Sequence, residues 1–308
     1  MKKEEFPKIK GKLILAPMAG VTNVAFRILC KKLGAGICYT EFFHTDALQK
    51  GNVFDVVKEE RPVVTQIFGN DENKLYEAAK SLVGKTDVVD LNIGCPAPKV
   101  IGLGSGAALL KDLKKVESIL KKLSTLNIPI SCKIRLGVNE KNIVALELAK
   151  IADKYCCAIA VHARTLEQGY SGKADWSYIK KIKESVSISV IGNGDIDKVE
   201  DVKRMIDQTG CDYVMVGRRA MKDPFFFRRV NHYLKTGIIL PEESFEEKMK
   251  LLLEYLKLCK KYDCFEVNNF KFLFVQFSRG YKNSSKLRVE VSKIKNVEEL
   301  LHKIKELC

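Results

Sequence analysis

Between residues 13 and 238, short apolar runs alternate with longer amphipathic ones, and this alternation most constrains the fold. Eight of the short runs have the length and composition of buried strands. They are Leu13–Met18, Ile37–Glu41, Val63–Phe68, Val88–Ile93, Ile130–Arg135, Ala158–His162, Ser187–Gly192 and Tyr213–Gly217. Repeated strand–helix units predict parallel strands that are joined by crossover helices.

Helical patterns separate nearly all of these strand candidates. The clearest are Glu72–Val83, Leu113–Leu126, Asn142–Lys154 and Lys198–Gln208. Eight such units in about 225 residues fit an α/β fold of the (β/α)8 TIM barrel type, for which roughly 250 residues are typical. A doubly wound sheet is the alternative, but it usually carries a GxGxxG motif after an early strand, and the sequence has none.

The pattern changes after Gly237. Residues 243–308 show only helical periodicity, as in the apolar series Met249, Leu252, Leu253 and Leu256. We therefore predict two domains, a catalytic barrel over residues 1–237 and a small all-helical domain of about four helices over residues 238–308.

The chain is strongly basic, with 53 Lys and Arg residues against 38 Asp and Glu residues and a net charge of +15. Such an excess favours an acidic partner, and nucleic acid is the leading candidate. A lysine-rich surface that serves solubility or heat stability explains the charge equally well. No apolar run approaches the ~20 residues that a membrane span needs, so we expect no membrane association.

The ten cysteines do not suggest a metal site. The sequence has no CxxC pair, and the spacings match neither a zinc site nor an iron–sulfur cluster. No signal peptide is recognisable at the polar start, Met1–Glu5. We therefore expect mostly buried thiols, no metal and a cytoplasmic location.

In a barrel of this type the carboxyl ends of the strands converge on one face, where active sites lie. Small residues and polar side chains stand at these ends in this sequence. In chain order they are Pro17, Met18, Ala19, Gln66, Asn92, Cys95, Lys133, Arg135, His162, Arg164, Asn193, Gly194, Asp195, Gly217 and Arg218. We expect these residues to surround one site.

Cys95 is the candidate catalytic residue of this set. The strand Val88–Ile93 runs into Gly94-Cys95-Pro96, and Pro96 cannot continue a strand ladder because it has no N–H. Cys95 therefore lies where a core strand becomes a loop, at the level of Lys133. A buried structural thiol is the alternative interpretation of such a cysteine.

The last two strand ends predict a phosphate site, because Gly194 and Gly217 precede helix starts and Arg218 adds a charged fork. Gln66 offers an amide that suits the edge of a heteroaromatic ring. Lys133 would stabilise the reduced, anionic ring of a flavin. Together these residues favour FMN. A sugar phosphate would fit the phosphate site equally well but would leave the other polar strand ends unexplained.

These motifs resemble those of the tRNA-dihydrouridine synthase family, and the match runs in family order through residues 15–218. The matching stretches are Leu15–Asn23, Asp90–Pro96, Gly106–Leu110, Lys133–Gly137, His162–Tyr170, Ala174–Trp176, Ile191–Ile196 and Val214–Arg218. The Asn-x-Gly-Cys-Pro and His-Ala-Arg-Thr-x-x-Gln-x-Tyr strings are the most specific.

The resemblance implies an FMN-binding barrel and a C-terminal helical domain that helps to select the tRNA position. It implies reduction of the C5=C6 bond of specific tRNA uridines to 5,6-dihydrouridine, with electrons taken from NADPH or NADH through the flavin. By motif, FMN would be held by Pro17, Met18, Ala19, Gln66, Lys133, His162, Asn193, Gly194, Asp195, Gly217 and Arg218. Cys95 would donate a proton, Asn92 and Arg135 would hold the uracil, and Arg164 would lie near substrate or phosphate.

Elementary chemistry agrees with these roles. Hydride arrives at uracil C6 from one face of the ring, so a proton must reach C5 from the other. A cysteine is mostly protonated at neutral pH and can donate that proton. The base must first leave its RNA stack, and a basic surface that grips tRNA phosphates offsets that cost. We expect tRNA as the partner of a monomeric enzyme.

Two other functions compete with this one. An FMN barrel that acts on a free pyrimidine, similar to dihydroorotate dehydrogenase, needs neither a +15 charge nor an added helical domain. A non-catalytic RNA-binding protein would not need Cys95, Lys133 and His162 together at the strand ends.

Overall fold

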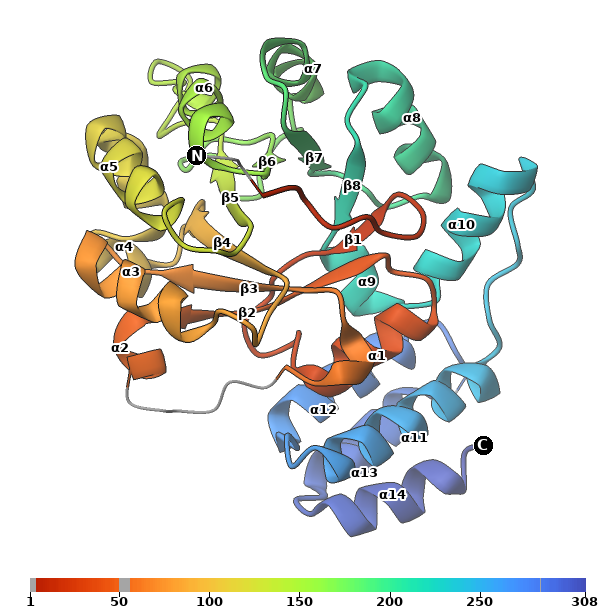
Figure 1. The fold of residues 1–308 in the computed structure, drawn as a ribbon. Helices are drawn as coiled ribbons and strands as arrows, with labels where there is room; N and C mark the ends of the chain where they lie inside the picture. The colour runs from red at the N-terminus through yellow and green to blue at the C-terminus, as the bar shows by residue number, and fades with distance from the viewer. Residues whose placement is uncertain (1–3, 50–55, 283) are drawn as a thin grey trace.

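The computed structural model describes residues 4–49, 56–282 and 284–308. Its centre is a closed barrel of eight parallel strands in the order β1 to β8, surrounded by helices (Figure 1). The strands are β1 Leu13–Leu15, β2 Ile37–His44, β3 Val63–Phe68, β4 Val88–Ile93, β5 Ile130–Arg135, β6 Ala158–His162, β7 Ser189–Asn193 and β8 Tyr213–Val216. The predicted (β/α)8 TIM barrel is therefore confirmed.

Helices follow the strands around the barrel and then form the C-terminal part of the chain. The barrel helices are α1 Val24–Lys32, α2 Thr45–Gln49, α3 Glu72–Ser81, α4 Pro98–Gly102, α5 Leu113–Leu123, α6 Ala145–Tyr155, α7 Trp176–Ser185, α8 Val199–Thr209, α9 Arg218–Lys222 and α10 Phe226–Thr236, with 3-10 turns η1 Lys58–Glu60 and η2 Gly106–Lys111. The C-terminal helices are α11 Phe245–Lys261, α12 Val267–Phe277, α13 Ser284–Lys293 and α14 Val297–Lys305. No helix among the described residues is long and apolar enough to cross a membrane.

Four strands differ from their predicted bounds, and β8 does so only by ending at Val216, one residue before Gly217. β1 ends at Leu15, shortly before Pro17, which has no N–H to donate. β2 continues to His44 across an irregularity in its pairing with β3 between Tyr39 and Phe42, as a β-bulge produces. β7 begins at Ser189 because the preceding backbone turns to bond the Asp153 carboxylate.

The interior of the barrel is apolar at one end and polar at the other. Toward the amino ends of the strands it is filled by Ile14, Ile37, Val64, Val88, Ala158 and Ile191. Toward the carboxyl ends the same inward-facing rows continue as Gln66, Asp90, Asn92, Ser131 and Lys133. The polar end of the barrel is therefore the end at which a site can form.

The C-terminal helices lie together beside α1 and α9 of the barrel (Figure 1). Asn23, which caps α1, donates from its amide to Tyr255 Oη at 3.0 Å. Lys261 of α11 bonds Glu59 at 3.0 Å. Gly237 ends α10 with φ of 75°, at the predicted boundary. That residues 1–237 and 238–308 are separate domains stays a prediction.

A buried ion-pair cluster fixes the start of the helical part. Glu243, just before α11, is paired with Arg229 of α10, which also pairs with Asp223. Tyr281 Oη donates to the Glu243 carbonyl at 2.6 Å. Glu243 thus ties α10 of the barrel to the chain that follows α12.

We expect Glu243→Ala to lower the free energy of unfolding by roughly 3 kcal/mol, because it removes one partner of a buried ion pair. The neighbouring Glu242 is the matched control, since its side chain is 68% exposed and its pairing with Arg219 lies at the surface. Glu242→Ala should change stability by less than about 0.5 kcal/mol. Urea denaturation measures both, and equal effects would contradict the anchoring role.

Candidate active site

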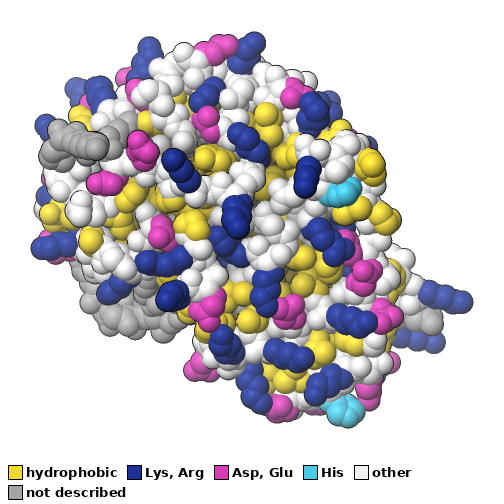
Figure 2. Space-filling model, turned by 45° about the vertical axis from the view of Figure 1, so that its right-hand side comes forward, with side chains coloured by type: hydrophobic (Ala, Val, Ile, Leu, Met, Phe, Trp, Pro, Cys, Tyr) yellow, Lys and Arg dark blue, Asp and Glu magenta, His cyan; other side chains and the backbone are white. Residues whose placement is uncertain are grey.

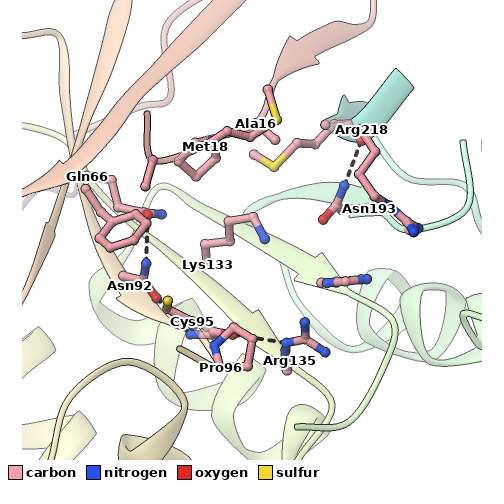
Figure 3. Close-up of a pocket in the computed structure, with 18 of the residues that line it drawn as sticks. Ala16, Met18, Gln66, Asn92, Cys95, Pro96, Lys133, Arg135, Asn193 and Arg218 are labelled. Carbon is pink, nitrogen blue, oxygen red and sulfur yellow. Dashed lines mark hydrogen bonds between the residues drawn. The ribbon is translucent and has the colours of Figure 1, made fainter. Parts of the chain in front are cut away.

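A cavity of about 460 Å³ opens at the carboxyl ends of the strands (Figure 3). All the residues predicted from the strand ends line it, with the exception of Arg164. The predicted residues in its wall are Pro17, Met18, Ala19, Gln66, Asn92, Cys95, Lys133, Arg135, His162, Asn193, Gly194, Asp195, Gly217 and Arg218. Positions that are 200 residues apart in the chain thus meet in one site because the strands are parallel.

The strand register places the polar side chains at two successive levels of the barrel. Asn92 of β4 is paired with Lys133 of β5. Arg135 of β5 is paired with His162 of β6, which is paired with Asn193 of β7. Paired residues of neighbouring parallel strands point to the same face. Asn92 and Lys133 therefore belong to one layer around the cavity, and Arg135, His162 and Asn193 belong to the next layer toward the carboxyl ends.

A chain of hydrogen bonds crosses β3, β4 and β5 beneath the cavity. Ser131 Oγ donates to Asp90 Oδ1 at 2.6 Å, and Gln66 Nε2 donates to Asp90 Oδ2 at 2.8 Å. Asn92 Nδ2 donates to Gln66 Oε1 at 2.8 Å (Figure 3). Because Gln66 donates to one partner and accepts from another, the orientation of its amide is determined.

The same chain of hydrogen bonds reaches Cys95. Asn92 Oδ1 accepts from the backbone N–H groups of Gly94, at 3.0 Å, and Cys95, at 2.9 Å. Arg135 Nε donates to the Gly94 carbonyl at 3.0 Å. A Cβ on Gly94 would lie 3.2 Å from the backbone carbon of Ile134, which explains the glycine here. Cys95 is thereby held at the cavity wall and stays partly exposed.

The charged groups of the site are perturbed by burial. Burial, reinforced by the Arg135 charge, lowers the pKa of Lys133 to about 8 against the opposing effect of Asp90. The Lys133 amine points into the middle of the cavity (Figure 3). Burial raises the pKa of Asp90 to about 6, although hydrogen bonds from Ser131 and Gln66 oppose the shift.

His162 is neutral at physiological pH. Burial, with the positive charges of Lys133 and Arg135, lowers its pKa to about 2. A neutral imidazole offers one donor and one acceptor, so His162 is better suited to contact a polar ring than to contact an anionic group.

The ends of β7 and β8 form the opposite side of the cavity. Asn193 Nδ2 donates to the Met215 carbonyl at 2.8 Å and joins these two strands. Gly194 adopts φ of 120°, a conformation that side chains rarely adopt. Arg218 is half-exposed at the first position of α9. This side combines backbone N–H groups, a helix start and a guanidinium, as phosphate sites in barrels do.

Arg164 lies behind the cavity wall. Its side chain is 2% exposed and pairs with Asp195 at 2.7 Å. Its Nε and Nη2 also donate to the carbonyls of Ser171, at 3.1 Å, and Gly172, at 2.7 Å. That Arg164 lies near substrate or phosphate stays a prediction, and its buried side chain does not line the cavity.

Sequence reasoning left several residues in and around the site without a role, and three of them are polar or aromatic side chains of interest. Asp90 stands in the quoted motif, and a carboxylate in an otherwise apolar strand was the available signal. Tyr170 is 59% exposed and lies over the guanidinium of Arg218, with 4.8 Å from guanidinium carbon to ring centre. Phe42 lines the cavity after the irregularity in β2, which no sequence signal marked.

The cavity fits a flat, polar ring that carries a phosphate group. One wall presents an oriented amide, Gln66, the centre presents Lys133, and the β7–β8 side presents a phosphate-binding arrangement. Nowhere in the described ranges do three or more His, Cys, Asp or Glu side chains gather in a group that could hold a metal ion.

We expect Asn92→Ala to release the Cys95 loop, because two backbone N–H groups lose their acceptor. Stability should fall by about 1–2 kcal/mol, and alkylation of Cys95 by a thiol reagent, followed by mass spectrometry, should become several-fold faster. Asn139→Ala is the matched control, since Asn139 Oδ1 accepts a similar local bond from Lys141 N–H at the surface. An unchanged Cys95 alkylation rate in Asn92→Ala would show that Asn92 does not hold the loop.

Comparison with known proteins identifies the family of the chain. The family model described as Dihydrouridine synthase (Dus) matches residues 14–307. A probable tRNA-dihydrouridine synthase of Aquifex aeolicus (strain VF5) is 36% identical over 314 residues, which cover 96% of this chain and 96% of the relative. The tRNA-dihydrouridine synthase B of Pseudomonas aeruginosa is 40% identical over 256 residues, which cover 80% of this chain and 77% of the relative.

Solved structures share the fold at low sequence identity. Histamine dehydrogenase from Rhizobium sp. 4-9 superposes with a TM-score of 0.57 at 12% identity, over 81% of this chain and 49% of that one. Morphinone reductase superposes with a TM-score of 0.53 at 12% identity, over 76% of this chain and 88% of that one. With the family model matching nearly the whole chain and relatives at 36–40% identity, the chain belongs to the dihydrouridine synthase (Dus) family.

Proposed function

We propose that the protein is a tRNA-dihydrouridine synthase that reduces the C5=C6 bond of specific tRNA uridines to 5,6-dihydrouridine, with FMN as cofactor and NADPH or NADH as electron donor. The observation that carries this proposal is the position of Cys95, which is held at the wall of a cavity into whose middle the Lys133 amine points. Family membership and the names of the relatives support the same reaction.

FMN, when bound and reduced, supplies hydride to the uracil ring. The task of the protein is then to place the base and to deliver a proton to C5 from the opposite face. Cys95 is the donor that we assign to this step, because its thiol lies in the cavity wall and its backbone is fixed by Asn92. Closure of the site by the base would exclude water from this transfer.

The residues that would hold FMN divide by position. The oriented Gln66 amide and the Lys133 amine suit the pyrimidine edge of the flavin ring, and neutral His162 adds one more polar contact. The backbone of Pro17, Met18 and Ala19 allows close approach to the ring. Asn193, Gly194, Asp195, Gly217 and Arg218 would surround the phosphate.

For the uracil we propose Asn92 and Arg135. Asn92 gives one amide N–H to Gln66, so its second N–H is available to a uracil carbonyl. Arg135 Nη1 donates to the carbonyls of Thr165 and Gly169, both at 2.8 Å. These bonds orient the guanidinium at the cavity wall, where its remaining N–H groups could bind a second uracil oxygen.

A tRNA substrate explains the charge better than a free pyrimidine does. Lys and Arg side chains are spread over both the barrel and the helical part of the face in Figure 2, with Asp and Glu side chains between them. A small substrate would use only the cavity, whereas tRNA phosphates would use a broad basic face. We therefore expect tRNA affinity to fall steeply as salt concentration rises.

Dihydrouridine mapping tests the proposed reaction. A strain that lacks this gene should lose dihydrouridine at one or more tRNA positions, and the wild-type gene should restore it. Cys95→Ala should restore at least ~10²-fold less activity while leaving FMN affinity within about twofold. Cys308→Ala is the control, because Cys308 is also partly exposed but lies at the end of the helical part.

Three outcomes would contradict different parts of the proposal. Unchanged dihydrouridine in the deletion strain contradicts the proposed function, and full activity of Cys95→Ala removes only the proton-donor role. A purified protein that stays colourless after addition of FMN counts against the cofactor.

The lowered pKa of Lys133 predicts a pH dependence of FMN binding. Above about pH 8 the lysine of the free protein loses its proton, and with it the attraction for the electron-rich edge of the flavin. FMN affinity, measured by flavin fluorescence, should fall about tenfold between about pH 7 and pH 9.5. Lys133→Met should bind weakly with little pH dependence, and Lys133→Arg should stay charged throughout. If FMN affinity still falls with rising pH in Lys133→Met, a group other than Lys133 is responsible for the pH dependence.

A further inference from the structure

The position of Arg164 suggests a role that differs from substrate contact. Its side chain is 2% exposed, and it does not line the cavity. Nη2 donates to both carboxylate oxygens of Asp195, at 2.7 and 2.8 Å, and to the Gly172 carbonyl. Nε donates to the Ser171 carbonyl, and Nη1 lies 3.5 Å from His162 Nε2. Arg135 is buried to the same extent but lines the cavity. Arg164 does not line it, so its guanidinium faces the protein and not the substrate.

Asp195 is the residue through which Arg164 meets the cavity. Asp195 lines the cavity between the ends of β7 and β8, and its carboxylate lies 3.6 Å from Arg218. It adopts φ of 55°, which is uncommon outside glycine, so its backbone is held there by surrounding contacts. The Ala174 N–H, at 2.7 Å, and the Arg164 guanidinium supply contacts of this kind.

A carboxylate at this place is an electrostatic problem for a phosphate site. The loops after β7 and β8 are where barrels bind phosphate, and two anions at close range repel each other. Partial burial works to raise the pKa of Asp195, but the Ala174 N–H and the Arg164 guanidinium lower it overall. Asp195 is therefore ionised at neutral pH, and a neighbouring cation must balance it before phosphate can bind.

We propose that Arg164 is a positioning residue for the cofactor phosphate, which neutralises the Asp195 carboxylate and fixes the Gly194-Asp195 turn from behind the cavity wall. This inference rests on the proposed FMN site. Arg218 alone cannot serve both anions, because its distance from Asp195 is longer and its side chain is half-exposed. With Arg164 bound to Asp195, the half-exposed guanidinium of Arg218 remains available to the phosphate.

The same contacts fix the local backbone. Trp176 Nε1 donates to the Gly194 carbonyl at 3.0 Å, and a Cβ on Gly194 would lie 2.8 Å from the Cβ of Ala174. The turn is therefore packed against the loop that Arg164 holds through Ser171 and Gly172. Loss of Arg164 would free both the carboxylate and the loop.

The test compares FMN with riboflavin, which has the same ring system but no phosphate. Dissociation constants of both flavins are measured by fluorescence for wild type, Arg164→Met, Asp195→Asn and the double variant. Arg164→Met should weaken FMN binding at least tenfold and riboflavin binding less than threefold. The double variant should recover most of the FMN affinity, because it removes the unbalanced carboxylate.

Equal weakening of both flavins by Arg164→Met, or a double variant as weak as Arg164→Met, would overturn the role. If Arg164→Met fails to fold, as judged by circular dichroism, the variants Asp195→Asn and Arg164→Lys test the positioning role of Arg164 instead. Asp195→Asn should favour FMN over riboflavin at least as strongly as the wild type does. Arg164→Lys should keep the wild-type preference for FMN within threefold. A tenfold loss of the preference in Asp195→Asn overturns this role. A wild-type protein that binds neither flavin contradicts the cofactor proposal itself.

Discussion

The site depends on one chain of buried hydrogen bonds that runs from Ser131 through Asp90, Gln66 and Asn92 to the backbone of Cys95. Each member uses its donors and acceptors on the next, so no side chain in the series can rotate independently. Gln66, which we assign to the flavin, and Cys95, which we assign to proton donation, thus belong to one rigid unit. A buried carboxylate at its centre is tolerated because two donors bind it and Lys133 lies nearby.

Basic and acidic side chains lie next to each other on both sides of the cavity. Lys133 and Arg135 gather around the cavity, with Asp90 buried among them. On the opposite side, Asp195 is balanced by Arg164 and Arg218. The net result is a positive cavity with two internal counter-ions, which suits an electron-rich ring and a phosphate better than a neutral ligand.

Much of this architecture could be predicted from the sequence, because strand periodicity and strand ends are local properties. Lys133 was assigned to the site because it is a lysine within an apolar strand, and His162 was assigned because an apolar run ends with it. The exposure of Arg164 could not be predicted, because it depends on a loop that folds back over it. Phe42 was missed for a similar reason: only the pairing of β2 with β3 shows the irregularity that brings it to the cavity.

The buried pairing of Glu243 with Arg229, together with the Asn23–Tyr255 contact, joins the helical part to the barrel at two separate places. Two fixed points leave little freedom for a hinge. If tRNA contacts both parts, the distance between the helical surface and Cys95 is fixed. The uridine that is reduced is then the one that lies at this distance from the RNA segment bound by the helices. New positions could then be selected by altering the outer faces of the helices while the anchors and the chemistry stay unchanged.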